Sequence, residues 1–185
     1  MTHDDLLERL EANHAAAYCW ALGCCRRDPA EAEEVLQIVY LKILEGKARF
    51  RGESSFRTWL FAVVRTTAAD RRRRSALHSL RLLRFAERGT TRAEESPAER
   101  LERREAGAVF RRALERLPTR QREALELVFY HDLTIEEAAS VMGISLGSAR
   151  THYERGKKRL RTLLGDSEVV YEHGWRSGEH SRELS

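Results

Sequence analysis

The chain has 185 residues, of which 42% are hydrophobic and 34% charged, and its net charge is +4. This size fits one domain or two small ones, and the low content of glycine (11) and proline (3) argues against an all-β fold. The sequence has no apolar run near the roughly 18 residues of a membrane span, and its acidic N-terminus does not resemble a signal peptide. We therefore expect an all-α cytoplasmic protein that does not contact a membrane.

The first part of the chain predicts two helices before residue 46. Apolar residues recur at three- and four-residue steps over residues 7–25, which indicates one amphipathic helix. Asp28, Pro29 and Glu31 then supply the N-cap, the first helical position and the capping acid of a second helix. Gly46 ends that helix. Acidic side chains outnumber basic ones here, so we expect this part to face a different partner from the basic segment that follows.

A third helix, from about Ser55 to Arg73, follows a polar loop. Phe50, Phe56 and Trp59 flank the loop, and the helix ends in four consecutive arginines. Arginine neutralises phosphate, whereas flat aromatic faces stack on bases that have left a duplex. Phe56 is expected in the core, while Trp59 is equally compatible with the core and with the surface. The segment from residue 50 to residue 74 therefore predicts a surface for nucleic acid, including a strand that has been opened.

The second part of the chain predicts a small helical unit after a linker. Periodicity fades over residues 75–95, which we interpret as a flexible linker that has room for a short helix at residues 78–85. The serine–proline pair at residues 96–97 begins a helix that Pro118 interrupts, and another helix begins at Thr119. The tail over residues 165–185 is polar, and we expect it to be disordered.

Two helices joined by a short glycine turn complete the second part. Thr134 and Glu137 form a capping box, Gly143 supplies the left-handed turn residue, and Ser145 caps the last helix, Leu146–Leu164. Basic side chains dominate that last helix. This pattern is typical of a DNA-binding helix-turn-helix, in which the start of the second helix reads base edges and later residues hold phosphates.

Histidine and cysteine residues offer a different interpretation. Cys19, Cys24 and Cys25 are expected to be buried thiols in a reducing compartment, because adjacent cysteines match no common metal-ligand spacing. Together with His14 they leave a redox or metal sensor as an alternative. We expect no enzyme, no bound metal, no cofactor and no small-molecule substrate, because no His/Cys set has catalytic spacing and no glycine-rich phosphate loop is present.

In this order the motifs resemble the sigma-70 family of bacterial transcription initiation factors, above all its small extracytoplasmic-function (ECF) class. The resemblance covers nearly all of residues 15–164. DPAEAEEVLQIVYLKIL is similar to the region 2 helix that docks on the clamp helices of RNA polymerase. FRGESSFRTWL and the arginine-rich helix after it are similar to the part that opens and reads the −10 element. Residues 117–160 are similar to region 4, which reads the −35 element.

The resemblance implies two small helical domains whose partners are core RNA polymerase, promoter DNA and a candidate anti-sigma factor. The units would be region 2 at residues 1–74, a linker at 75–95, region 4 at 96–164 and a tail at 165–185. The residues that would bind core polymerase are Glu31, Glu33, Glu34 and Gln37. Those that would bind the −10 element are Arg51, Gly52, Glu53, Ser54, Ser55, Trp59, Arg65, Thr66, Arg71, Arg72 and Arg73. Those that would bind the −35 element are Ser148, Arg150, Thr151, His152, Glu154, Arg155, Lys157 and Lys158.

Such a factor carries no chemistry of its own and confers promoter specificity on polymerase. One alternative in the same area is a helix-turn-helix regulator that acts without polymerase and has no need of the segment from residue 50 to residue 74. We also expect the two halves, each with a small core of its own, to be able to pack together and hide both DNA surfaces.

Overall fold

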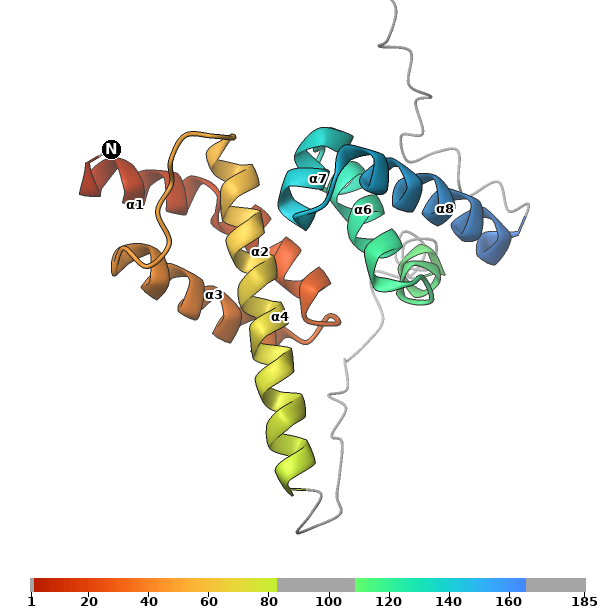
Figure 1. Cartoon of the computed structure of the whole chain (residues 1–185), viewed down its shortest axis with the longest axis horizontal. Helices are drawn as coiled ribbons and strands as arrows, with labels where there is room; N and C mark the ends of the chain where they lie inside the picture. The colour runs from red at the N-terminus through yellow and green to blue at the C-terminus, as the bar shows by residue number, and fades with distance from the viewer. Residues whose placement is uncertain (1, 83–108, 166–185) are drawn as a thin grey trace, which may run out of the picture.

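The computed structural model describes residues 2–82 and 109–165, and all regular secondary structure within these ranges is helical (Figure 1). The helices are α1 (His3–Ala12), α2 (His14–Cys24), α3 (Pro29–Leu44), α4 (Phe56–Leu82), α6 (Thr119–Phe129), α7 (Ile135–Met142) and α8 (Leu146–Leu164). Residues 109–115 also form a helix, just before α6. The predicted all-α fold is confirmed. Over residues 83–108 and 166–185, the predicted linker, the helix after it and the tail lie outside the described residues.

Predicted capping signals are confirmed at the start of α3 and around α7. The Asp28 carboxylate accepts a hydrogen bond from the backbone N–H of Glu31 at 3.1 Å. Thr134 and Glu137 form a reciprocal capping box at the start of α7. Gly143 ends α7 with φ +62°, a left-handed conformation that glycine adopts without a steric penalty. This turn brings the start of α8 directly beside the end of α7. Within the described residues, no helix is both long and apolar enough for a membrane span.

Two helix boundaries differ from the prediction. Residues 7–25 form two helices, because the backbone leaves helical geometry at Asn13 (φ −103°, ψ 1°). The Asn13 side chain donates to the Arg9 carbonyl at 2.8 Å and so satisfies an acceptor at the end of α1. Helix α4 extends beyond Arg73 to Leu82, because it contains neither glycine nor proline and is rich in the helix formers arginine, alanine and leucine. The first eight residues of the predicted linker, 75–82, are therefore helical.

Helices α2, α3 and α4 pack around Trp20 and Phe61. Both side chains are 0% exposed and their ring centroids lie 6.0 Å apart. The indole Nε1 of Trp20 donates to the Phe61 carbonyl at 3.0 Å, so the buried donor has a partner. Val35 and Val39 of α3 and Leu60 of α4 are also fully buried in this cluster. This core holds α2 and α4 side by side.

Helices α6, α7 and α8 form a second unit. Leu125 of α6 and Leu160 of α8 are buried together with Leu114 from the helix before α6. Helix α8 approaches α6 closely at Gly156, where a Cβ atom would lie 3.2 Å from the backbone oxygen of Gln121. Glycine therefore sets the distance between these two helices, and the opposite side of α8 is left to solvent.

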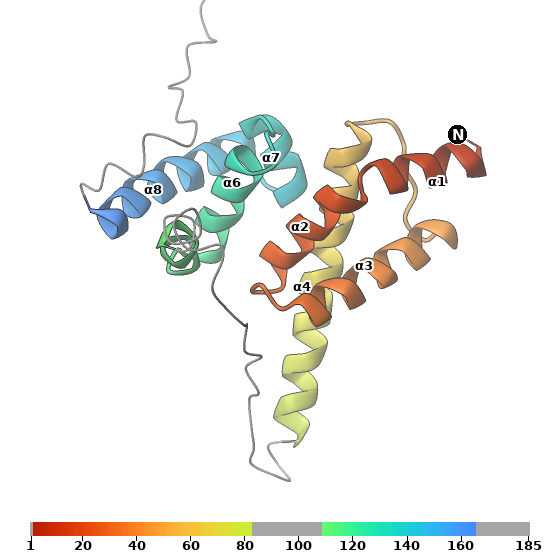
Figure 2. The same ribbon diagram turned by 180° about the vertical axis from the view of Figure 1, so that it is seen from behind.

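The two units pack on each other, and one buried cluster spans both. Helix α7 lies against α4, and α6 lies against α2, in both views of the ribbon (Figures 1 and 2). Leu127 and Met142 of the second unit belong to the same buried cluster as Trp20 and Phe61. The expectation of two separate cores is therefore wrong for the first unit, whose core includes side chains of the second, whereas the cluster around Leu125 and Leu160 stays separate. The cause of the shared cluster is the position of α7, which packs on α4 and on α8 at once.

Candidate nucleic-acid interface

One exposed face of α3 carries the residues predicted for polymerase binding. Glu33, Glu34 and Gln37 are exposed, and Glu31 is half-buried. Leu41 and Leu44 continue this face towards the end of the helix and are 57% and 46% exposed. The opposite face of α3 packs into the core through its valines. Helix α3 therefore presents acidic residues near its start and two leucines near its end to solvent.

The acids of α3 and the arginines of α4, which the sequence assigned to different partners, meet at one point. The Arg71 guanidinium donates to both carboxylate oxygens of Glu34. Arg72 instead donates to the Cys24 carbonyl at the end of α2. The Arg73 side chain is 79% exposed. Of these three consecutive arginines, Arg73 is therefore the most accessible to an incoming phosphate.

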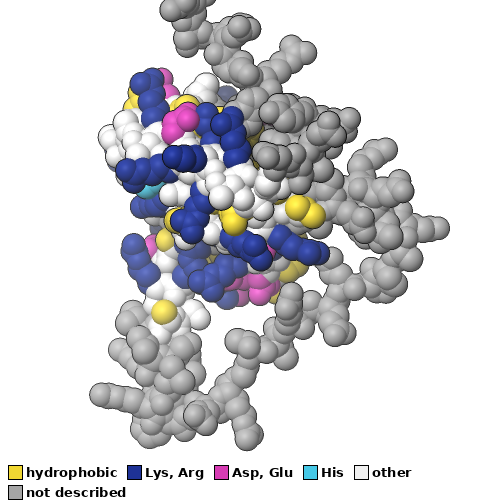
Figure 3. Space-filling view, turned by 90° about the vertical axis from the view of Figure 1, so that its right-hand side faces the viewer, with side chains coloured by type: hydrophobic (Ala, Val, Ile, Leu, Met, Phe, Trp, Pro, Cys, Tyr) yellow, Lys and Arg dark blue, Asp and Glu magenta, His cyan; other side chains and the backbone are white. Residues whose placement is uncertain are grey.

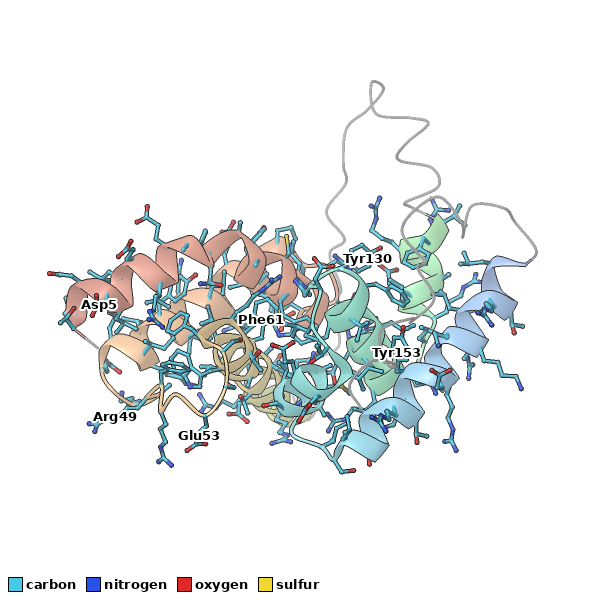
Figure 4. All side chains as sticks on the ribbon, turned by 90° about the horizontal axis from the view of Figure 1, so that it is seen from above. Asp5, Arg49, Glu53, Phe61, Tyr130 and Tyr153 are labelled. Atoms are coloured by element: carbon cyan, nitrogen blue, oxygen red, sulfur yellow. The ribbon has the colours of Figure 1, made fainter. Side chains whose placement is uncertain are left out.

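An aromatic cluster supports the loop over residues 51–55. The ring centroids of Phe50, Phe56 and Trp59 lie between 5.2 and 5.4 Å apart. Phe56 is buried, as predicted, whereas Trp59 is half-buried. In the loop itself Arg51, Gly52, Glu53 and Ser55 are exposed and Ser54 is half-buried. Figure 4 shows Glu53 at the outer edge of the molecule, far from the central Phe61. Short polar side chains in an exposed loop can here bond a base that has left its stack.

Arg65 and Thr66 lie midway along α4 in different surroundings. Thr66 is exposed, and its hydroxyl donates to the Ala62 carbonyl of its own helix. Arg65 faces α6, where its Nε lies 3.2 Å from Oε2 of Glu123, and the two side chains are only 16% and 6% exposed. The two atoms are close enough for an ion pair but are not aligned for a hydrogen bond. The C-terminal unit therefore covers Arg65 in this conformation.

The predicted recognition helix α8 is open to solvent along one side. Ser148, Arg150, Thr151, Glu154, Arg155 and Lys158 are exposed, whereas His152 and Lys157 are half-buried. Lys157 turns back on its own helix, with Nζ 2.8 Å from Oε1 of Glu154 and 4.6 Å from the centre of the Tyr153 ring. Figure 3, which views the molecule from the α8 side, shows lysine and arginine side chains gathered over this face. An exposed basic helix after a tight turn has the geometry to enter a major groove.

The cysteines do not form a site. Cys24 and Cys25 are buried, as expected, while Cys19 is exposed. Burial raises the pKa of the Cys25 thiol to about 11 and raises the pKa of Cys24 well above its usual value, so both stay protonated and unreactive near neutral pH. In the part of the chain that the structure describes, no group of three or more His, Cys, Asp or Glu side chains is arranged to hold a metal ion.

Sequence reasoning missed a set of charged and polar residues between the two units. Arg27 Nη2 donates to Glu126 Oε1 at 2.9 Å, which links the end of α2 to α6. His131 is buried between Trp20 and Phe61, with ring centroids 5.7 and 4.9 Å away. Burial lowers the pKa of His131 to about 4, assisted by nearby arginines. The two glutamates of α6 look like ordinary surface residues in the sequence, so no local pattern distinguishes them.

Comparison with known proteins identifies both units. The family model for sigma-70 region 2 matches residues 9–77, and the model for sigma-70 region 4 matches residues 108–160. The chain therefore belongs to the sigma-70 family of RNA polymerase sigma factors, and within that family to the ECF class.

Individual relatives agree with this assignment. The chain is 31% identical over 169 residues to the RNA polymerase sigma factor CarQ of Myxococcus xanthus, a match that covers 89% of this chain and 92% of that protein. It is 29% identical over 140 residues to the ECF RNA polymerase sigma factor SigM of Mycobacterium tuberculosis, covering 75% and 67% of the two chains. Its fold is similar to that of the sigma factor RpoE from Bartonella quintana, solved in complex with the anti-sigma factor NepR. That similarity has a TM-score of 0.67 at 23% identity and covers 86% and 96% of the two chains.

Proposed function

We propose that this ECF sigma factor binds core RNA polymerase through the exposed face of α3, and promoter DNA through the loop over residues 51–55, α4 and α8. The observation that carries the proposal is the joining of region 2 and region 4 in one chain. A helix-turn-helix regulator that acts alone has no use for region 2, so that alternative is not favoured. The chain works in the cytoplasm beside polymerase and catalyses no reaction itself.

The units of this function are residues 1–74 for polymerase docking and the −10 element, and residues 96–164 for the −35 element. Residues 75–95 connect them, and residues 165–185 form a tail. The helical continuation of α4 to Leu82 supports a connection whose first part is stiff rather than a coil.

The α3 face suits a protein partner. Exposed leucines beside a charged rim are typical of an interface whose apolar part contributes affinity and whose charges steer the encounter. Leu41 and Leu44 supply the apolar part, and Glu33, Glu34 and Gln37 supply the polar one. We assign Leu41 and Leu44 to the polymerase-binding face alongside the predicted residues.

The DNA contacts divide into two roles. Helix α8 reads duplex DNA, with Arg150 and Thr151 at base edges and Arg155 and Lys158 at phosphates. The loop over residues 51–55 and the neighbouring Trp59 hold unpaired bases, so they bind opened DNA better than closed DNA. This preference supplies the free energy for melting, because a protein shifts an equilibrium towards the state that it binds more tightly.

Transcription with purified bacterial core polymerase on fragmented genomic DNA tests the proposal. We expect discrete transcripts that core polymerase alone does not make. The double variant Leu41→Ala/Leu44→Ala should lose polymerase binding, measured on native gels, because it removes the apolar part of the α3 face. Leu7→Ala removes a leucine of similar exposure (43%) from α1 and should leave binding unchanged. A wild-type chain without affinity for core polymerase would overturn the proposal.

A further inference from the structure

We propose that contacts of α6 and its following loop with α2 and α4 form an intramolecular lock, which closes part of the −10 surface while it leaves the −35 helix open. The inference rests on the proposed function, because it concerns access to one of the two DNA surfaces. The lock consists of Arg65–Glu123, Arg27–Glu126 and the buried His131. It needs no second protein.

The first contact removes a DNA-binding residue from solvent. Arg65, which we assign to the −10 element, lies against Glu123 of α6 and has a side chain that is 16% exposed. Arg120 of α6 also approaches the same carboxylate, at 3.6 Å. Glu123 thus takes the place of a DNA phosphate in front of Arg65. While the lock is closed, α4 cannot offer this arginine to DNA.

The second contact is built from both sides of the interface. Arg26 and Arg27 have φ values of +54° and +64°, an uncommon left-handed conformation for side chains other than glycine. The turn that they form carries Arg27 to Glu126 of α6. Gly23 lets the Glu126 carboxylate approach α2, since a Cβ atom there would lie 2.5 Å from Oε2. An unusual backbone turn and a glycine therefore accommodate the same buried carboxylate.

The third contact places an imidazole inside the shared core. His131 follows α6, is 4% exposed and meets the rings of Trp20 and Phe61. The guanidinium of Arg57 in α4 lies over the ring of Phe61, 5.4 Å from the ring centroid. The pKa of His131 is lowered to about 4, first by burial and then by Arg57 and Arg27, so the ring is neutral near neutral pH. A neutral ring here keeps the two units packed.

The contacts between the two units are also weak enough to be broken. Oε2 of Glu123, Oε2 of Glu126 and Nε of Arg57 are buried in the described residues without a hydrogen-bond partner. Buried ion pairs with unsatisfied atoms stabilise a contact weakly, because desolvation offsets most of the attraction. A pocket of about 330 Å³ that is partly open to solvent lies between the units and is lined in part by Arg57, Glu126 and His131, so solvent reaches the edge of the contact. Polymerase and DNA can therefore compete with the lock.

Small-angle X-ray scattering of the free full-length chain tests the lock. Glu123→Gln/Glu126→Gln keeps side-chain size but removes both buried acids, and we expect the ratio of closed to open forms to fall about tenfold or more. Gly23→Ala favours the α2 helix but displaces the Glu126 carboxylate, so it should shift the ratio in the same direction by less. Glu136→Gln makes a single exchange of the same kind at an exposed position of α7 and should match wild type. Circular dichroism verifies that each variant remains folded.

Labelling of Arg65 with phenylglyoxal, followed by mass spectrometry, gives a second readout. Arg65 should label slowly in wild type and in Glu136→Gln, and severalfold faster in Glu123→Gln/Glu126→Gln. Folded variants that keep the wild-type shape and the wild-type labelling rate would overturn the lock. The same samples mixed with core polymerase separate the two proposals. Opening of the variants without any polymerase binding would uphold the lock and reject the proposed function.

Discussion

Helices α4 and α8 both carry arginines that we propose to contact DNA, yet their accessibility differs. Arg65 of α4 is largely covered by Glu123, whereas Arg150 of α8 is exposed. The difference follows from the arrangement of the second unit, which packs α6 and α7 on α2 and α4 while α8 keeps one side free. In this conformation the packing therefore does not hide the residues of α8 that we propose for the −35 element, contrary to the expectation that it hides both DNA surfaces. When two DNA-binding units pack on each other, the packing can cover the DNA-binding residues of one unit and leave those of the other exposed.

The largest effect on the packing of the two units is expected from Trp20, which lies at their contact. Trp20→Ala should lower the free energy of unfolding by about 3–5 kcal/mol, because it empties a fully buried site between Phe61 and His131. It also leaves the Phe61 carbonyl without its donor. Urea denaturation followed by circular dichroism measures the change. Trp59→Ala, at a half-buried position, is the control and should cost clearly less. Equal losses would show that Trp20 has no special role at the contact.

The buried imidazole should make stability depend on pH. The pKa of His131 falls from 6.5 in the unfolded chain to about 4 in the folded one, so its contribution is complete above pH 6.5 and is lost as pH falls towards 4. The loss is on the order of 3 kcal/mol. Glu126 acts in the opposite direction, because burial raises its pKa, although Arg27 and Arg122 oppose that effect. The groups that face His131 from the packed elements include Arg57, Arg27, Asp132 and Glu126.

A substitution of His131 separates the contribution of the imidazole to the pH dependence of stability from the contributions of its neighbours. His131→Gln should lose the extra destabilisation between pH 6.5 and pH 4 that wild type shows, and denaturation midpoints at several pH values measure the difference. Exchange of the half-buried His152, which lies on α8 away from the contact between the units, for Gln is the control and should keep the wild-type pH profile. A His131→Gln profile that parallels wild type would mean that the imidazole is not the titrating group.

The two arginines should behave differently in DNA binding. Arg150→Ala should weaken holoenzyme binding to promoter DNA by about 1–3 kcal/mol and relax the preference at one base pair, because the arginine is exposed and free to reach a base edge. Arg65→Ala should leave duplex binding by the free, closed chain unchanged and act only once polymerase has opened it. Gel-shift titrations with promoter fragments measure both. A uniform loss across all sequences for Arg150→Ala would instead make it a phosphate contact.

Local signals in the sequence predicted much of the fold, because caps and turns depend on neighbouring residues. Asp28, Thr134 and Gly143 each act within a few residues of their position, and each was predicted. The break at Asn13 was not, because the apolar stripe continues across it. The end of α4 was placed too early, because the arginine run was interpreted as a boundary although arginine is a good helix former.

The candidate site could be predicted only for residues that we propose to contact external partners. The α8 residues are identified by charge and by their place after a turn, and the structure leaves them exposed. The lock could not be predicted, because Glu123 and Glu126 acquire their role from helices that lie far away in the sequence. A glutamate on an amphipathic helix is usually solvated, and only tertiary packing reveals a buried partner.

The smallest effects on stability are expected from the N-caps of α3 and α7, which lie in different units. Asp28→Ala and Thr134→Ala should each cost about 1 kcal/mol, because each removes the side chain that satisfies a backbone N–H at the start of a helix. Amide hydrogen exchange should then differ between them. Asp28→Ala should raise exchange at the start of α3. Thr134→Ala should raise it in α7 and in the part of α4 around Thr58, whose hydroxyl donates to Glu137 at 3.4 Å. Exchange confined to α7 would mean that this helix does not transmit disorder to α4, and the closed state would then depend on the α6 contacts alone.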